Sequence, residues 1–204
     1  MIDRPPIWLQ GLFGRLRIKM PSGKKELYLT FDDGPTMGHS RWILDQLNCF
    51  NSKATFFCIG NNIEKHPEVF QDILNSGHRV GNHSYDHIHN WKTSQKVIRE
   101  DFERCQELHG FDLYRPPYGE FSPKLLRAVP KLPIVLWDVL TEDYNPKRSP
   151  EFCLEKSLRK TRDGSIVVLH DSDKAWERMS YVLPRYLKHF SEKGYTFKAL
   201  PSTA

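Results

Sequence analysis

The sequence has few cysteines, and they lie far apart. Its 204 residues contain four, namely Cys49, Cys58, Cys105 and Cys153, and no two of them form a C-x-x-C pair. This spacing excludes a zinc knuckle and a paired redox centre. We expect Cys58, inside the apolar run ATFFCIG, to be a small core residue.

Long apolar runs are also absent, and no stretch is long enough to span a bilayer. The first twenty residues contain prolines and an acid where a signal peptide has a basic start and an apolar core. With four thiols, this favours a cytoplasmic location, with the cell envelope as the alternative. Trp8, Leu12 and Leu16 can share one helical face, flanked by Arg15. We interpret residues 1–25 as a segment packed on the domain; the alternative is a segment lying on a membrane surface, without stable insertion.

Nucleotide-binding motifs are missing as well. Neither G-x-G-x-x-G nor G-x-x-x-x-G-K-[ST] occurs, which weakens a nucleotide-binding doubly wound fold. The net charge is +5 and the pI is near 9.0, but the basic residues are scattered and no nucleic-acid motif accompanies them. We therefore predict no nucleic-acid partner. Without a linker, a repeat or a low-complexity stretch, residues 26–204 are predicted to form one domain.

Short apolar runs alternate with longer amphipathic ones along the chain. The predicted strands are 26–31, 54–59, 78–83, 112–117, 134–139, 165–171 and 195–200. The predicted helices are 40–50, 64–76, 94–109, 125–129, 150–162 and 179–193. Ser40 is expected to cap the first helix, and Ser149-Pro150 to begin the fifth. This alternation predicts an α/β fold with a parallel sheet, open or closed into a barrel.

The segment LYLTFDDGPT, residues 27–36, runs an apolar strand into two adjacent acids. Because burial of an unpaired carboxylate is costly, these acids need a partner. Other titratable groups follow later strands: His83, Arg115, Asp138, His170 and Asp171. The carboxyl ends of the strands form the active face of α/β barrels, so we expect all of these groups on one rim.

The segment HSYDH places His83 and His87 four residues apart. On a helical turn, both imidazoles would point the same way and could hold one divalent metal ion with a strand-end aspartate. Two histidines and one aspartate leave positions open for water and substrate, as in a catalytic site. Zinc is the favoured metal, and cobalt or nickel would also suit these ligands.

Five segments, TFDDGP, HSYDH, RPPYG, WDVLTEDY and VVLHD, resemble in order and approximate spacing the motifs of the polysaccharide deacetylase family. This family is also called the NodB-homology domain or carbohydrate esterase family 4. The resemblance runs from about residue 26 to the end of the chain. It implies a distorted (β/α)7 barrel that removes acetyl, with a metal ion, from an N-acetylated glycan such as peptidoglycan or a chitin-like polymer.

The resemblance also implies a role for each matching residue. Asp33, His83 and His87 match the metal ligands, and Asp32 matches the general base. Arg115 matches the arginine that pairs with this base, which would keep the carboxylate ionised and oriented.

The remaining roles concern the leaving group and the acetyl group. The backbone N–H of Tyr118 matches a donor to the oxyanion, and His170 matches the general acid that protonates the leaving amine. Asp143 matches the acid that orients His170, with Asp138 as the competing assignment. Leu169 would line the pocket for the acetyl methyl.

The chain departs from the family where Tyr144 replaces a frequent Trp and where Leu140 follows Val139. Both changes affect the groove wall, and therefore substrate choice. Trp91 could stack on a sugar ring, or be a core aromatic. Three other functions stay open: an acetyl esterase on xylan, a hydrolase of another amide, and a carbohydrate-binding barrel without catalysis.

Overall fold

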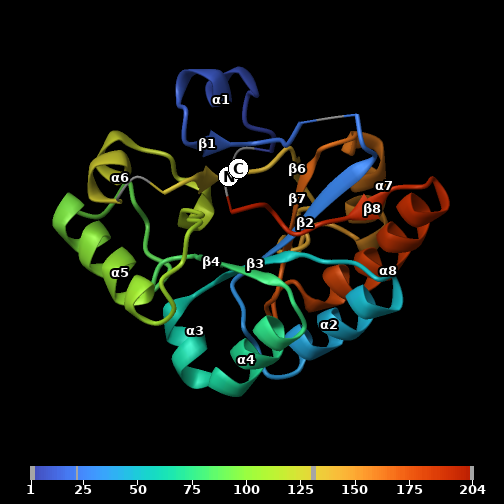
Figure 1. Cartoon of the computed structure of the whole chain (residues 1–204), viewed down its shortest axis with the longest axis horizontal. Helices are drawn as coiled ribbons and strands as arrows, with labels where there is room; N and C mark the ends of the chain where they lie inside the picture. Colours follow the sequence, from blue (N-terminus) through green and yellow to red (C-terminus); the bar gives the residue numbers. More distant parts are fainter. Residues whose placement is uncertain (1–2, 22, 130–131, 203–204) are drawn as a thin grey trace.

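A parallel sheet forms the centre of the molecule (Figure 1). The computed structural model describes residues 3–21, 23–129 and 132–202. Five strands follow the order β4-β3-β2-β7-β6, and β8 also pairs with β2. Every one of these pairs is parallel. The strands are β2 (Glu26–Asp32), β3 (Thr55–Cys58), β4 (Arg79–Asn82), β6 (Val139–Leu140), β7 (Ile166–His170) and β8 (Thr196–Phe197).

Residues 134–140 link the two ends of this sheet. Their first part, β5 (Ile134–Val135), pairs with β1 (Leu16–Arg17) and bridges to Tyr114, which bridges to β4. Their last part, β6, pairs with β7. The strands therefore follow a curved path that is consistent with a distorted (β/α)7 barrel, although no continuous ladder closes it among the described residues.

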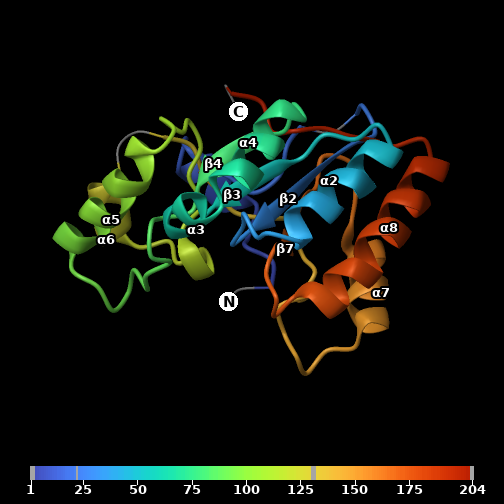
Figure 2. The ribbon, with the colours of Figure 1, turned by 90° about the horizontal axis from the view of Figure 1, so that it is seen from below.

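Helices surround the strands (Figures 1 and 2). They are α1 (Trp8–Leu12), α2 (His39–Cys49), α3 (Gly60–Lys65), α4 (Pro67–Asn75), α5 (Gln95–Glu107), α6 (Pro123–Ala128), α7 (Pro150–Lys160) and α8 (Trp176–Glu192). The predicted start of α7 is confirmed: Pro150 is its first residue, and the Ser149 hydroxyl accepts a hydrogen bond from the N–H of Phe152 at 3.1 Å.

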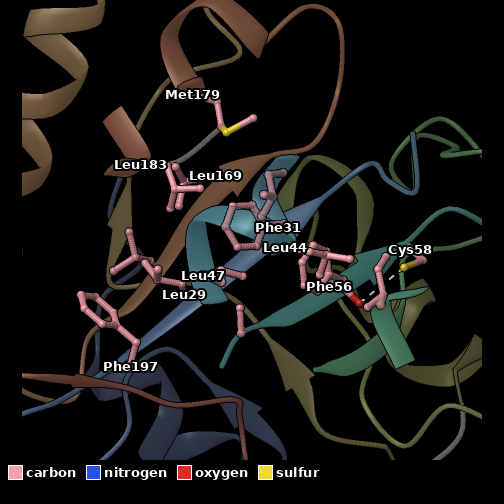
Figure 3. Packing of buried hydrophobic residues seen from close by; sticks show 14 of the residues in the cluster. Leu29, Phe31, Leu44, Leu47, Phe56, Cys58, Leu169, Met179, Leu183 and Phe197 are labelled. Atoms are coloured by element: carbon pink, nitrogen blue, oxygen red, sulfur yellow. Dashed lines mark hydrogen bonds between the residues drawn. The ribbon is translucent and has the colours of Figure 1, made fainter. Parts of the chain in front are cut away.

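The largest apolar cluster includes the sheet and α8. Figure 3 shows Leu29 and Phe31 of β2 and Leu169 of β7 near Met179 and Leu183 of α8. Side chains alternate between the two faces of a strand, so His170 points away from this cluster. The alternation of β7 thus directs one face to the core and the other to the site described below.

Three local predictions are wrong. Ser40 lies inside α2, where its hydroxyl accepts a hydrogen bond from the N–H of Thr36 at 2.7 Å. The helix predicted over 64–76 is two helices, because Pro67 lacks the N–H that would continue α3 and instead begins α4. Residues 112–117 form no strand, and Tyr114 contributes isolated bridges.

The segment before β2 contacts the domain at several points. Leu16 and Ile18 are fully buried, whereas α1 has no buried residue. Arg4 forms an ion pair with Asp138 at 3.0 Å, and Asp3 forms one with Lys156 at 2.5 Å. The division of the chain at residue 25 stays a prediction.

Candidate active site

Three side chains that follow β2 and β4 converge on one point. Asp33, His83 and His87 each offer a ligand atom within 4.8 Å of the others. Oδ1 of Asp33 is 3.8 Å from Nε2 of His83 and 3.5 Å from Nε2 of His87. Nδ1 of His83 is 2.8 Å from the carbonyl oxygen of Arg115, which leaves Nε2 to face the other two ligands. Burial, together with His83, lowers the pKa of His87 to about 4 and keeps its imidazole neutral. This donor set fits a divalent metal ion.

The helical turn predicted for HSYDH is wrong. The segment is a loop with positive φ at Ser84 (66°) and His87 (54°). Asp101 of α5, which no sequence motif marks, accepts hydrogen bonds from the N–H groups of Tyr85 at 3.0 Å and Asp86 at 2.8 Å. The Ser84 hydroxyl accepts one from the N–H of His87 at 3.0 Å. The loop and its buried carboxylate, rather than helical spacing, therefore bring the two imidazoles together.

Asp32 ends β2 and faces a guanidinium. Its Oδ1 is 2.6 Å from Nη1 of Arg115, which is fully buried and also donates to two backbone carbonyls in 135–136. Burial alone would raise the pKa of Asp32, but Arg115, His83 and His170 together lower it below its usual value. The carboxylate is therefore ionised, held in one orientation and able to accept a proton.

His170 ends β7 and is held by a second buried carboxylate. Oδ1 of Asp143 is 2.7 Å from its Nδ1, and Oδ2 accepts its backbone N–H at 2.8 Å. Burial opposes protonation of the imidazole, but the charge and hydrogen bond of Asp143 outweigh it and raise the pKa of His170 to about 9. The imidazolium therefore carries at neutral pH a proton that it can donate into the cleft.

Asp138 lies at the amino end of β7, away from His170. Its predicted place on the rim is therefore wrong, and so is its competing assignment as the partner of His170. Its carboxylate accepts hydrogen bonds from Arg162 at 3.0 Å and from Ser165 at 2.7 Å, at the amino end of β7. Arg4 lies 3.0 Å away. These contacts connect the segment before β2 to the sheet.

Asp171 is buried behind the loop that carries Asp33. Its carboxylate accepts hydrogen bonds from the hydroxyls of Thr36, at 2.6 Å, and Ser40. Burial is the main reason that its pKa rises to about 6. A Cβ on Gly34 would overlap this carboxylate. Asp171 does not line the cavity and instead supports the loop.

The site opens into a cavity of about 760 Å³. The Tyr144 ring lies edge-on to His170 with centroids 4.9 Å apart, and the Tyr118 ring stacks on His89 at 3.7 Å. Trp91 lines the cavity with 56% of its surface exposed, so its alternative interpretation as a core aromatic is wrong.

The apolar wall of the cavity differs from the expected one. Leu169 packs in the core cluster and does not line the cavity, so its predicted place is wrong. Leu136 and Trp137 line the wall instead. Gly119, with a φ of +65°, approaches Trp137 so closely that a Cβ would overlap the indole ring. Leu9 and Leu16 of the N-terminal segment complete this wall.

The chain resembles known proteins in sequence. A model of the family described as Polysaccharide deacetylase matches residues 19–137. A peptidoglycan-N-acetylglucosamine deacetylase of Bacillus cereus is 34% identical over 191 residues, which are 89% of this chain and 69% of that protein. The peptidoglycan-N-acetylmuramic acid deacetylase PdaC of Bacillus subtilis is 30% identical, and the match covers 84% of this chain but 37% of PdaC.

The structure also resembles solved structures. A peptidoglycan N-acetylglucosamine deacetylase in complex with 4-naphthalen-1-yl-N-oxidanyl-benzamide superposes with a TM-score of 0.87 at 31% identity, covering 97% of this chain and 95% of that one. A pseudoenzyme of carbohydrate esterase family 4 from Bacillus anthracis superposes with a TM-score of 0.82 at 23% identity, covering 96% and 71%, which shows a shared fold alone. Sequence and structure together lead to one conclusion: the chain belongs to the polysaccharide deacetylase family.

Proposed function

We propose that this protein is a metal-dependent hydrolase that removes acetyl from an N-acetylated glycan, and that peptidoglycan is its substrate class. The observation that carries the proposal is the arrangement of three groups around one cleft. The candidate metal ligands line the same cavity as Asp32, which is paired with Arg115, and His170, which is paired with Asp143. The names of the relatives, several of them peptidoglycan deacetylases, support the substrate class.

Asp33, His83 and His87 would hold the metal ion. Zinc is favoured by two imidazoles and one carboxylate, and cobalt or nickel would also fit. A bound divalent ion supplies a Lewis acid that polarises the acetyl carbonyl and lowers the pKa of water to about 7.

Asp32 acts as the general base. Because Arg115 holds its carboxylate ionised and in one orientation, it can take a proton from the attacking water without moving. The backbone N–H of Tyr118, at the RPPYG turn, is proposed to donate to the oxyanion that forms when the carbonyl oxygen of the acetyl group takes up negative charge.

His170 acts as the general acid. It delivers a proton to the amide nitrogen, so that the sugar leaves as an amine and acetate is released. Asp143 keeps Nδ1 of this imidazole protonated, which directs Nε2 towards the reacting atoms. Tyr144 and Trp91 line the cavity as platforms for sugar rings.

A carbohydrate-binding barrel without catalysis is the alternative of a different class, because a pseudoenzyme shares this fold. The complete set of base, acid and ligands argues against it here. A xylan acetyl esterase would use the same groups but depend less on the acid, because an alkoxide leaves more readily than an amine anion.

The test is acetate release from peptidoglycan, N-acetylglucosamine oligomers and acetylated xylan, with and without a chelator. Asp32→Asn should lower turnover of the favoured substrate by about 10²–10⁴-fold, while metal content stays unchanged. Asp45→Asn, an exposed residue on α2, is the matched control. Full activity of the Asp32 variant would defeat the assignment, and metal-dependent glycan binding without acetate release would favour the inactive barrel.

A further inference from the structure

Large apolar side chains are exposed around α1. The exposed fractions are 37% for Ile7, 65% for Trp8, 67% for Leu12 and 36% for Phe13. In the described part of the chain, the other exposed large apolar residues are Met37, Trp91, Val97 and Phe152, which are widely separated in sequence. We call Ile7, Trp8, Leu12 and Phe13 the α1 face. An exposed apolar concentration of this kind marks an interaction site more often than scattered residues do.

The α1 face belongs to an anchored segment. The side chain of Gln10 accepts hydrogen bonds from the N–H groups of Ile18 and Lys19 at 2.8 and 3.1 Å. Phe13 packs edge-on against Phe121 at a centroid distance of 5.1 Å. The Gln10 contacts hold α1 to residues 18–19 of the same segment, and the contact of Phe13 with Phe121 joins the segment to the domain. The side chains of Trp8 and Leu12 stay exposed.

One side of α1 is exposed, and the other side faces the cavity of the candidate active site. Trp8 and Leu12 are four residues apart and share the outer side of the helix. Leu9 and Pro5 line the cavity of the candidate active site. Figure 1 places α1 at the upper edge of the molecule, beyond β1. The α1 face thus belongs to a segment that also lines the cleft, and Trp8 and Leu12 are exposed on the other side of the helix.

The rim of the α1 face is basic. Arg15 and Arg17 follow it directly, and Arg15 donates to the carbonyl of Leu126 at 3.0 Å, next to Arg127. Arg17 is held by the carbonyl of Gly14 at 2.8 Å in an exposed contact. The nearby acid in the segment, Asp3, is neutralised by Lys156 and Lys160. Apolar side chains followed by two partly exposed arginines, Arg15 and Arg17, are complementary to a layer of hydrocarbon beneath anionic headgroups.

We propose that the α1 face docks the protein on an anionic lipid surface. Four side chains expose on the order of a few hundred Å², which is less than the roughly 800 Å² per partner of a stable protein complex. A few apolar side chains that enter the headgroup layer, with cations beside them, are enough for reversible membrane binding. None of the helices in the described residues is long and apolar enough to cross a membrane. Docking would bring the cleft close to the headgroup layer.

The test is co-sedimentation of the whole chain with vesicles, either phosphatidylcholine alone or an equal mixture with phosphatidylglycerol. We expect binding to the anionic vesicles that weakens with added salt. The double change Trp8→Glu and Leu12→Glu should lower the partition coefficient at least about tenfold, and Arg17→Gln should lower it about fivefold. Val97→Glu on α5 and Lys188→Gln on α8 are matched controls that should leave binding unchanged, since both residues are exposed on helices that Figure 1 places away from α1.

Two further measurements make the result decisive. Quenching of tryptophan fluorescence by brominated lipids should fall in Trp8→Phe, a conservative change at an exposed position. Size-exclusion chromatography separates membrane docking from self-association. The proposal is overturned if anionic vesicles do not bind the chain at low salt, if the double variant binds like the original chain, or if the α1 face proves to be covered by a second copy. Because no readout uses acetate release, failure here would leave the proposed function untouched.

Discussion

Both ends of β7 bury an aspartate beside a basic group, but the two aspartates differ in what they can do. At the amino end, Asp138 accepts hydrogen bonds from Arg162 and Ser165 and pairs with Arg4. At the carboxyl end, Asp143 holds His170 through its ring and its backbone N–H. The two carboxylates are five residues apart in sequence, and both are fully buried.

The difference lies in the partner. An arginine keeps its proton throughout the accessible pH range, so Asp138 can contribute only a fixed charge pair. A histidine can gain and lose a proton, and His170 also lines the cavity. Parallel α/β folds place their reactive groups at the carboxyl ends of strands, and the two ends of β7 follow this rule.

Of the changes that test this difference between the two aspartates, Asp143→Asn should have the largest effect on turnover. The amide of Asn can donate to Nδ1 of His170, which would stabilise the neutral ring with the wrong tautomer. We expect turnover to fall about 10²–10⁴-fold with little change in metal content. Steady-state acetate release measures the effect. Unchanged turnover would show that His170 needs no carboxylate partner.

The same variant should change the pH dependence. In the proposed mechanism His170 acts as the acid only when protonated, so activity should decline as the pH rises through its pKa of about 9. Without the negative charge of Asp143, burial should lower that pKa, and the decline should begin at lower pH. A profile of turnover against pH for both proteins would reveal this shift, which a loss of folding alone would not produce.

The matched change at the other end, Asp138→Asn, should affect stability instead. It removes the charge that Arg162 and Arg4 share, but both arginine side chains are partly exposed and can be solvated. We therefore expect a loss of about 1–2 kcal/mol in the free energy of unfolding. Turnover of the folded enzyme should stay within about twofold, because the reactive groups of such folds lie at the opposite end of the strand. Denaturant titration measures the change in the free energy of unfolding, and acetate release measures turnover.

The family motifs allowed much of this site to be predicted from sequence. The adjacent acids, Asp32 and Asp33, follow a buried apolar strand, and that local pattern alone demands a partner. RPPYG and VVLHD then supply Arg115 and His170 by their resemblance to the family. The structure brings these groups together because parallel strands end at the same edge of the sheet.

What could not be predicted depends on contacts between distant segments. Asp138 directly precedes the short strand β6 and Asp143 follows it by three residues, and only the tertiary structure shows which of them meets His170. Leu169 was misplaced because the irregular path of residues 134–140 provides the cavity wall instead. The loop at His83 and His87 looked helical by spacing alone, whereas its conformation depends on Asp101, which is 14 residues beyond His87.

Asp101 extends the comparison to an aspartate whose partners are backbone N–H groups, and it carries the smallest expected effect on turnover at saturating metal. Asp101→Asn keeps the shape of the side chain, but one of its two acceptor oxygens becomes an NH₂ group. One of the N–H groups of Tyr85 and Asp86 would then lose its acceptor. Because this loop orients His83 and His87, we expect metal affinity to fall about tenfold, with turnover at saturating metal nearly restored. Metal titration measures the change.

Asp86→Asn is the matched control, since it removes an equal charge from an exposed side chain of the same loop and should leave affinity nearly unchanged. Equal losses in the two variants would mean that charge near the site, rather than support of the loop, determines the affinity.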